Sequence, residues 1–179
     1  MNGVMNLLHQ RGTALIMALV VLLLLTILGL SAMNTTVLEE KMASNAKDKL
    51  LAFEAAESAL LHAEGWLALN ASTAVFPDAA NGLYTPNVCP GSSTAGATPV
   101  WDCVVWTGTA NLVIYPNLPG STSAQPMLGN VSAQPKYIIE LLNTTATTPQ
   151  RRRFRVTAYG NGSSSNSVAM VQSIVEITL

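Results

Sequence analysis

Charged side chains are scarce in this sequence of 179 residues: they make up 11% of it, whereas a soluble globular domain carries about 25%. Aromatic residues contribute only 6%, so the 49% of hydrophobic residues are mostly aliphatic side chains and alanine. The net charge is −1, which gives the chain no field to attract nucleic acid. We therefore expect no nucleic-acid partner, and the apolar fraction argues against a disordered chain.

Histidine is also scarce, since the sequence holds only His9 and His62. Catalysis by a Ser-His-Asp or Cys-His arrangement within the C-terminal part of the chain is thereby excluded. A pair formed by Glu140 and Glu176 on neighbouring strands could serve acid-base chemistry, but solvated strand charges are the simpler interpretation. We expect no catalytic residues, no cofactor and no enzymatic activity.

Cysteine is limited to Cys89 and Cys103. A zinc site would need further cysteine or histidine ligands, and none lies nearby in the sequence. In an oxidising compartment the pair instead predicts one disulfide, which is worth about 3 kcal/mol through closure of its loop. Asp78 and Asn81 could offer oxygen ligands to calcium, but their spacing does not fit an EF-hand, so no metal site is predicted.

One long apolar run stands near the N-terminus. Thr13–Met33 contains 21 residues without a charge and would form a helix of about 30 Å, the thickness of the bilayer's hydrocarbon core. A cleaved secretory signal is a weaker alternative, because its apolar region is shorter and ends in a small-residue pattern. Arg11 precedes the run and Glu39 follows it, so the positive-inside rule predicts a single span with a cytoplasmic N-terminus and an exported C-terminal part.

The helix is predicted to continue to about Asn70, because no proline precedes Pro77 and apolar residues recur every three or four positions. This stripe is expected to pack on the chain's own C-terminal part, with a separate coiled-coil partner as the alternative. The stripe comprises Met42, Ala46, Leu50, Phe53, Ala56, Leu60, Ala63 and Leu67. Around Gly29, poor helix formers favour either a local bend or the close approach of a neighbouring helix.

Beyond Asn70 the sequence alternates short β-branched runs with loops rich in proline, glycine and serine, which predicts strands. A turn at Gly160–Ser163 and a link over Thr144–Gln150 would join the last three strands into an antiparallel meander. The stretches Gly91–Pro99 and Pro116–Gln134 are predicted as loops. The predicted strands are Val100–Thr107, Lys136–Asn143, Arg151–Tyr159 and Val168–Leu179.

The single charge run holds Arg151, Arg152, Arg153 and Arg155. Strand alternation places Arg151, Arg153 and Arg155 on one face, and Arg152 on the other beside Phe154. An anionic or acidic partner is one hypothesis for this run. The alternatives are protection of an edge strand and a solvated face.

The leader resembles the class III signal of type IV prepilins: Gln10-Arg11-Gly12-Thr13-Ala14-Leu15-Ile16 joins a short polar segment directly to the aliphatic helix. The resemblance implies that a prepilin peptidase cuts between Gly12 and Thr13 and methylates the new amine, leaving 167 mature residues, which is 179 minus 12. Major pilins carry glutamate at the fifth mature position, where this chain has Met17.

The similarity extends further, to the PilX-type minor pilins. It rests on Thr35–Met42, on Ala52–Glu57, and on three C-terminal stretches: Tyr137–Glu140, Phe154–Gly160 and Val171–Ser173. The resemblance implies an α+β, pilin-like fold in which a long N-terminal helix, membrane-spanning in its first half, packs on an antiparallel sheet. The expected parts are a leader (1–12), a membrane and assembly helix (13–33), an amphipathic helix (34–70) and a β head (71–179) with one disulfide loop.

By the same resemblance the chain would be a minor pilin that enters the pilus tip or priming complex and so supports adhesion and twitching motility. The implied partners are other minor pilins, the major pilin, a tip-associated adhesin, the inner-membrane assembly platform and the prepilin peptidase. The chain would lie in the inner membrane before assembly and on the cell surface afterwards. Alternatives are a pseudopilin of a type II secretion system, a membrane-anchored periplasmic binding protein or enzyme, and an adhesin in its own right.

Overall fold

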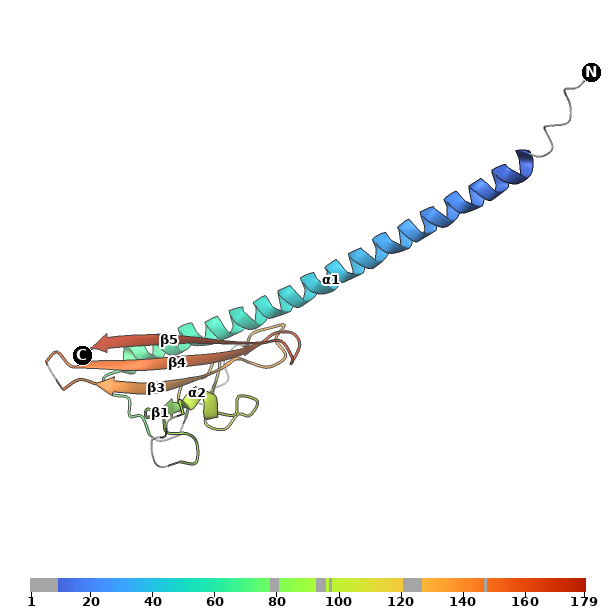
Figure 1. Cartoon of the computed structure of the whole chain (residues 1–179). Helices are drawn as coiled ribbons and strands as arrows, with labels where there is room; N and C mark the ends of the chain where they lie inside the picture. The colour runs from blue at the N-terminus through green and yellow to red at the C-terminus, as the bar shows by residue number, and fades with distance from the viewer. Residues whose placement is uncertain (1–9, 78–80, 93–95, 97, 121–126, 147) are drawn as a thin grey trace, which may run out of the picture. The chain divides into compact units, whose positions relative to one another are not determined.

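The computed structural model describes residues 10–77, 81–92, 96, 98–120, 127–146 and 148–179. These residues form two compact units, Met1–Ala46 and Lys47–Leu179. The elements, drawn in Figure 1, are α1 (Gln10–Asn70), β1 (Leu83–Tyr84), α2 (Val100–Cys103), β2 (Val113–Ile114), β3 (Lys136–Thr144), β4 (Arg151–Asn161) and β5 (Val168–Thr178).

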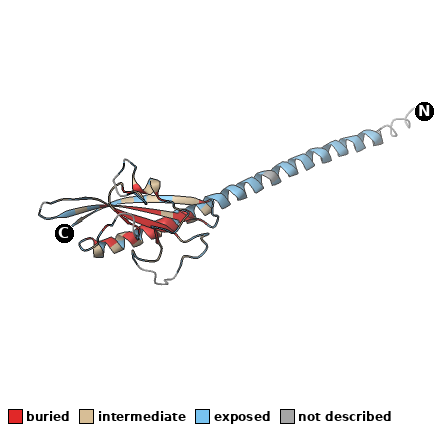
Figure 2. Cartoon of the chain, turned by 90° about the horizontal axis from the view of Figure 1, so that it is seen from below, coloured by how far each residue is buried: buried red, intermediate tan, exposed pale blue. Residues whose placement is uncertain are grey.

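The first unit is the N-terminal part of α1, and each of its described side chains is exposed, as the pale blue colour in Figure 2 shows. The helix runs through Gly29 and the poor helix formers after it without interruption. The hydroxyls of Thr35 and Thr36 donate to the carbonyls of Ser31 and Ala32, each at 3.2 Å. Such local bonds accommodate these residues in the helix, and no melted segment interrupts it.

The second unit contains a sheet in the order β1-β3-β4-β5, and β2 also pairs with β3, on the edge that does not face β4. Strands β3, β4 and β5 form the predicted antiparallel meander, whereas β1 joins β3 in parallel. With α1 packed on this sheet, the α+β, pilin-like fold is confirmed. The two-residue strands β1 and β2 were not predicted, because such short pairings leave no periodic signal.

The main core lies between the second half of α1 and one face of the sheet. Predicted stripe residues Ala56, Leu60, Ala63 and Leu67 are buried there. The rest of the stripe prediction is wrong, since Met42, Leu50 and Phe53 are 64%, 56% and 47% exposed. Small residues take their place in the contact. The buried members of this core include Ala59, Leu60, Ala63, Leu67, Tyr137, Ile139, Phe154, Val156 and Ala158.

Close approach of α1 to the sheet explains why alanine replaces larger residues in the contact. A side chain at Gly160 would collide with the backbone of Ala52 and Ala56, so glycine is required there. Gly160 itself belongs to β4, and the turn lies between Asn161 and Val168. The turn predicted at Gly160–Ser163 is therefore placed too early, because the β4–β5 ladder continues to the pair of Asn161 and Val168.

The other face of the sheet is covered by α2 and the loops around it. Val100, Val104 and Tyr84 are buried against Ile138 of β3. The strand predicted over Val100–Thr107 is wrong: Val100–Cys103 forms a helical turn after Pro99. A turn places Val100 and Val104 on one side, where both bury their side chains. The described parts of Gly91–Pro99 and Pro116–Gln134 contain neither helix nor strand, as predicted.

Candidate assembly and docking surfaces

The most apolar exposed surface is the first part of α1. Within the described residues, one helix is long and apolar enough to cross a membrane, and it contains the predicted span Thr13–Met33. Leu15, Leu22 and Leu30 are 70%, 65% and 63% exposed. A continuous apolar surface of this kind indicates contact with lipid or with other apolar helices.

The predicted processing and assembly residues lie at the start of this helix. Gly12 and Thr13 are both within the helical part of α1, one turn before Met17. The Met17 side chain is 70% exposed. These three residues belong to the first unit, whereas Cys89 and Cys103 belong to the second.

Cys89 and Cys103 are joined in a disulfide, with their Cα atoms 5.9 Å apart. The bridge ties α2 to the segment that follows β1. The predicted pairing is thus present in the structure, and it holds the helical turn that buries Val100 and Val104 against the sheet.

A buried lysine anchors the chain that follows α2. Lys136 is 7% exposed, and its Nζ donates to the carbonyls of Trp106 and Gly108 at 2.9 and 2.6 Å. The Trp106 ring stacks on Tyr159, with centroids 5.5 Å apart. Burial lowers the pKa of Lys136 from its ordinary value because a low-dielectric site disfavours the charged form.

Glu140 is the second buried charged side chain on this face, with 1% of its surface exposed. One carboxylate oxygen accepts a bond from the Asn87 backbone N–H at 2.9 Å, and the other from Arg155 Nη1 at 3.1 Å. Glu140 is therefore not the solvated charge that was predicted. It pairs across the strands with Arg155, and it is not brought together with Glu176.

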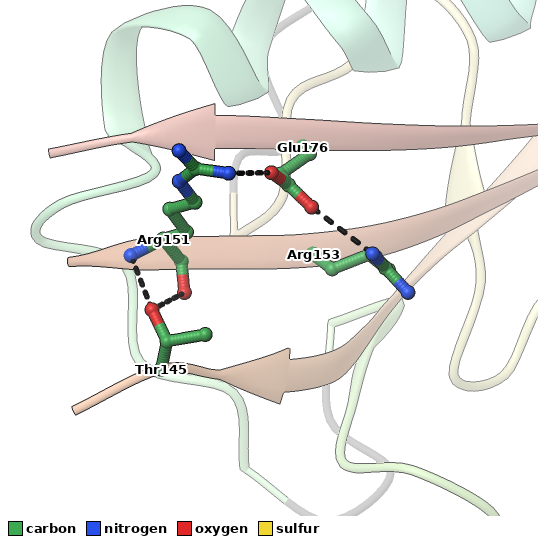
Figure 3. A network of polar contacts seen from close by, with 4 residues as sticks. All are labelled: Thr145, Arg151, Arg153 and Glu176. Atoms are coloured by element: carbon green, nitrogen blue, oxygen red, sulfur yellow. Dashed lines mark hydrogen bonds and ion pairs between the residues drawn. The ribbon is translucent and has the colours of Figure 1, made fainter. Parts of the chain in front are cut away.

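Glu176 instead lies at the far end of the meander, between two arginines (Figure 3). Its two oxygens accept bonds from Arg151 Nη1 at 3.3 Å and Arg153 Nη2 at 3.1 Å. Thr145 closes the network by accepting from the Arg151 backbone N–H and donating to its carbonyl. All three charged side chains are exposed by 39–57%, so these ion pairs contribute at most about 1 kcal/mol each.

This arrangement decides among the hypotheses for the arginine run. Protection of an edge strand is wrong, because β4 lies between β3 and β5. Arg155 is engaged by Glu140, and Arg151 and Arg153 share Glu176. Of these three arginines, only the pair at Glu176 keeps an excess of one positive charge, so the acidic-partner hypothesis rests on that pair.

Arg152 lies on the other face of β4, as predicted, and closes the C-terminal end of α1. Its guanidinium donates to the carbonyls of Ala71 and Ala74. It also lies over the rings of Phe76 and Phe154, at 5.7 and 5.8 Å. A cation suits the negative end of a helix dipole, but this contact between residues 81 and 78 positions apart left no signal in the sequence.

Asp48 is a further position that sequence reasoning missed. Its carboxylate accepts bonds from the backbone N–H and hydroxyl of Ser163 at 2.6 and 2.7 Å, and from the Ser164 N–H at 3.3 Å. These bonds, led by the Ser163 hydroxyl, lower the pKa of Asp48. Asp48 thereby fixes the β4–β5 turn to α1 where the second unit begins.

No group of three potential metal ligands occurs among the described residues. Asp78, one of the two calcium candidates, lies outside them, and Asn81 adopts a left-handed conformation with φ of 54° just before β1. The described part of the chain brings no set of side chains together that would hold a metal.

A long apolar helix whose second half packs on a mostly antiparallel sheet defines a pilin-like α+β protein. Two family models match this chain: PilX N-terminal over residues 11–61, and Type IV pilus assembly protein PilX C-term over residues 67–177. The chain belongs to the PilX family of type IV pilus assembly proteins. No curated protein and no solved structure gives a significant match.

Proposed function

We propose that this chain is a minor pilin, which enters the type IV pilus through its N-terminal helix and acts at the tip or in the priming complex. The observation that carries the proposal is the uncharged, exposed segment Thr13–Met33 in a member of a pilus assembly family. This surface is stable only in lipid or against apolar helices of other subunits. The subunit moves from the first environment to the second when the pilus assembles.

The proposed maturation step is cleavage between Gly12 and Thr13. The prepilin peptidase would remove the leader and methylate the amine of Thr13, leaving the apolar segment at the very N-terminus. Before assembly the subunit would sit in the inner membrane with its second unit in the periplasm, where the Cys89–Cys103 disulfide is stable.

The proposed partners are other minor pilins, the major pilin, a tip-associated adhesin and the assembly platform of the inner membrane. Adhesion and twitching motility would follow from pilus assembly, and not from a reaction at this chain. The family match supports contacts with pilus components in general.

Met17 supports a terminal position in the filament. A methylated N-terminal amine stays positive, and burying an unpaired cation in an apolar filament core costs several kcal/mol. Met17 offers no negative charge to the amine of a neighbour. A position that receives no neighbouring amine avoids this penalty, which favours the tip or the initiation of assembly.

A pseudopilin of a type II secretion system is the second candidate, because leader and helix are the same in that class. The C-terminal match to a type IV pilus assembly family favours the pilus. Deletion of the gene separates the two: we expect loss of surface pili with secretion intact, and loss of secretion with pili intact would support the pseudopilin.

Processing and incorporation are tested together on pili sheared from cells that express a tagged chain. We expect intact-mass analysis to find the chain in sheared pili, starting at Thr13 and carrying one added methyl group. Gly12→Val should leave the leader attached and the chain in the membrane. Gly3→Val, a matched change elsewhere in the leader, should be processed normally. A chain that starts at Met1 or near Ala32 in pili would refute the prepilin interpretation.

A further inference from the structure

The outer edge of β5 has an open row of backbone groups. The direction of these groups follows from the two ends of the hairpin, where Gly162 N–H donates to Ser167 and Leu179 N–H donates to Gln150, both at 2.8 Å. Both pairs fit the unbroken antiparallel register of β4 and β5. Because bonded and non-bonded pairs alternate in such a register, the odd-numbered residues of β5 bond to β4.

The even-numbered residues of β5 therefore direct their N–H and C=O groups away from β4. Val168 agrees with this assignment, since its carbonyl accepts a bond from Lys49 Nζ at 3.3 Å. We call the remaining residues the open edge: Met170, Gln172, Ile174, Glu176 and Thr178. Within the described part of the chain, β5 is the last strand of the sheet and no segment pairs with this edge.

The open edge also lacks the features that prevent an edge strand from pairing with another chain. Val168–Thr178 has no proline, glycine or lysine, and its single charge, Glu176, is bound by two arginines. The register with β4 has no bulge. Soluble proteins usually protect a long edge with lysine, proline or a bulge, so an edge left unprotected from Met170 to Thr178 indicates a partner strand.

The side chains of the open edge add apolar contacts to the backbone groups. Met170 and Ile174 are 42% and 62% exposed. They share one face of the strand, with Gln172 between them, because side chains alternate in direction along a strand. Gln172 is held by its Nε2, which donates to Thr157 Oγ1 at 2.8 Å.

We propose that the open edge receives an extended segment of a different polypeptide chain, which adds a strand to the sheet through main-chain hydrogen bonds. The segment would carry aliphatic side chains opposite Met170 and Ile174, and an uncharged residue between them. Strand addition of this kind takes its affinity from the backbone and its specificity from alternate side chains. The proposal rests on the proposed function, since the donor would be another subunit of the same filament.

A second copy of this chain is a poor partner for the open edge. Two identical edges pair symmetrically only in the antiparallel direction. The two helices would then have their Lys47 ends at opposite ends of the pair, because each helix lies along its own sheet. Since the chain continues from Lys47 to the apolar segment, the two apolar segments would be attached at opposite ends of the pair.

Amide hydrogen exchange of β5 tests the proposal directly. The full chain is measured alone in detergent and in sheared pili captured through a tag on this chain. We expect the amides of Met170, Gln172 and Ile174 to exchange rapidly in the isolated chain and at least tenfold more slowly in the pili. The odd-numbered amides, bonded to β4, should be slow in both samples.

A proline substitution at Gln172 tests whether the open edge is needed for assembly into pili. Gln172→Pro removes an outward N–H without removing a main-chain bond to β4, whereas Gln172→Thr loses the same side-chain bond to Thr157 but keeps the N–H. We expect Gln172→Pro to lower the amount of chain in sheared pili by about tenfold, the effect of losing one or two main-chain bonds. Gln172→Thr should assemble like the wild type, and thermal unfolding verifies that both variants fold.

The outcomes separate this proposal from the proposed function. Absence of the wild-type chain from pili would contradict the proposed function. Presence in pili with equally fast exchange at Met170, Gln172 and Ile174 would overturn the strand addition alone. Protection that already appears in the isolated chain and grows with its concentration would identify a second copy as the occupant, and would also overturn the proposal.

Discussion

The pair of Glu140 and Arg155 shows how one residue's role depends on its environment. Both charges lie on β3 and β4, where the alternation of the strands places them on the face covered by α2. Glu140 is nearly fully buried and also accepts a backbone bond from Asn87, two residues before Cys89. The carboxylate thus connects the sheet with the disulfide segment.

Removing Arg155 is expected to destabilise the protein more than removing a neighbouring arginine. Arg155→Met leaves the buried carboxylate without its cation, which should lower the free energy of unfolding by about 3 kcal/mol. Arg153→Met removes an exposed ion pair and should lower it by less than about 1 kcal/mol. Urea unfolding followed by tryptophan fluorescence measures both. Equal effects would mean that Glu140 gains nothing from its partner.

His62 gives the stability of the second unit a dependence on pH. It packs edge-on against Tyr115 at 5.2 Å and lies 3.4 Å from the Tyr137 hydroxyl. Burial lowers the pKa of His62 below its ordinary value of 6.5. Because the unfolded chain then binds more protons than the folded one, stability should fall as the pH drops from 6.5 toward the lower folded pKa.

The prediction is tested by comparing unfolding at pH 7.5 and pH 5.5, and by repeating both measurements with His62→Gln. We expect the wild type to lose stability at the lower pH and the variant to lose less. A wild type that is more stable at pH 5.5, with the difference removed in the variant, would show that protonated His62 gains a partner in the folded state.

Among the elements, α2 depends most on a covalent constraint. It contains only four residues, and its N-cap residue Pro99 makes no side-chain capping bond. A helix this short is unstable by itself. The Cys89–Cys103 bridge and the burial of Val100 and Val104 together hold it on the sheet.

Replacing both cysteines by alanine should therefore lower the free energy of unfolding by about 3 kcal/mol. It should also raise hydrogen exchange within Val100–Val104, while exchange in β4 changes little at moderate denaturant. Alkylation of the unfolded wild type should label two more thiols after reduction than before it. Two thiols that react without reduction would contradict the bridge, and unchanged exchange in α2 would show that packing alone holds it.

At the scale of the whole molecule, sequence predicted the features that repeat along the chain. The apolar run of Thr13–Met33, the end of α1 at Asn70 and the three strands of the meander each leave a periodic or compositional signal. The sequence did not predict features that depend on contacts between distant residues. Ala52 and Ala59 were missed as core residues because their burial depends on how closely α1 approaches Gly160.

The same distinction applies to the candidate site: local features were predicted, and contacts between distant segments were not. The disulfide was predicted because two cysteines allow one pairing, and the apolar helix because it is continuous. The burial of Glu140, the contact of Arg152 with the end of α1 and the open edge of β5 all depend on strand order. The turns predicted the order of the last three strands, but the place of β1 and of the elements that cover each face depends on distant contacts, and no local pattern in these strands reveals it.

We propose that this chain is a pilus subunit with a terminal position, and that Met17 restricts it to that position. Met17→Glu would supply a negative charge for a neighbour's amine and should increase the amount of chain along the shaft. Met17→Gln has nearly the same size without the charge, and should behave like the wild type. Both changes leave the cleavage pair Gly12 and Thr13 intact.

Immunoelectron microscopy of sheared pili that carry an epitope-tagged chain measures this most directly. We expect wild-type and Met17→Gln label to be confined to one end of the pilus, and Met17→Glu label to appear along the shaft as well. Wild-type label spread evenly along the shaft would contradict the terminal position, and a complete absence of wild-type label from pili would contradict the account of the chain as a pilus subunit.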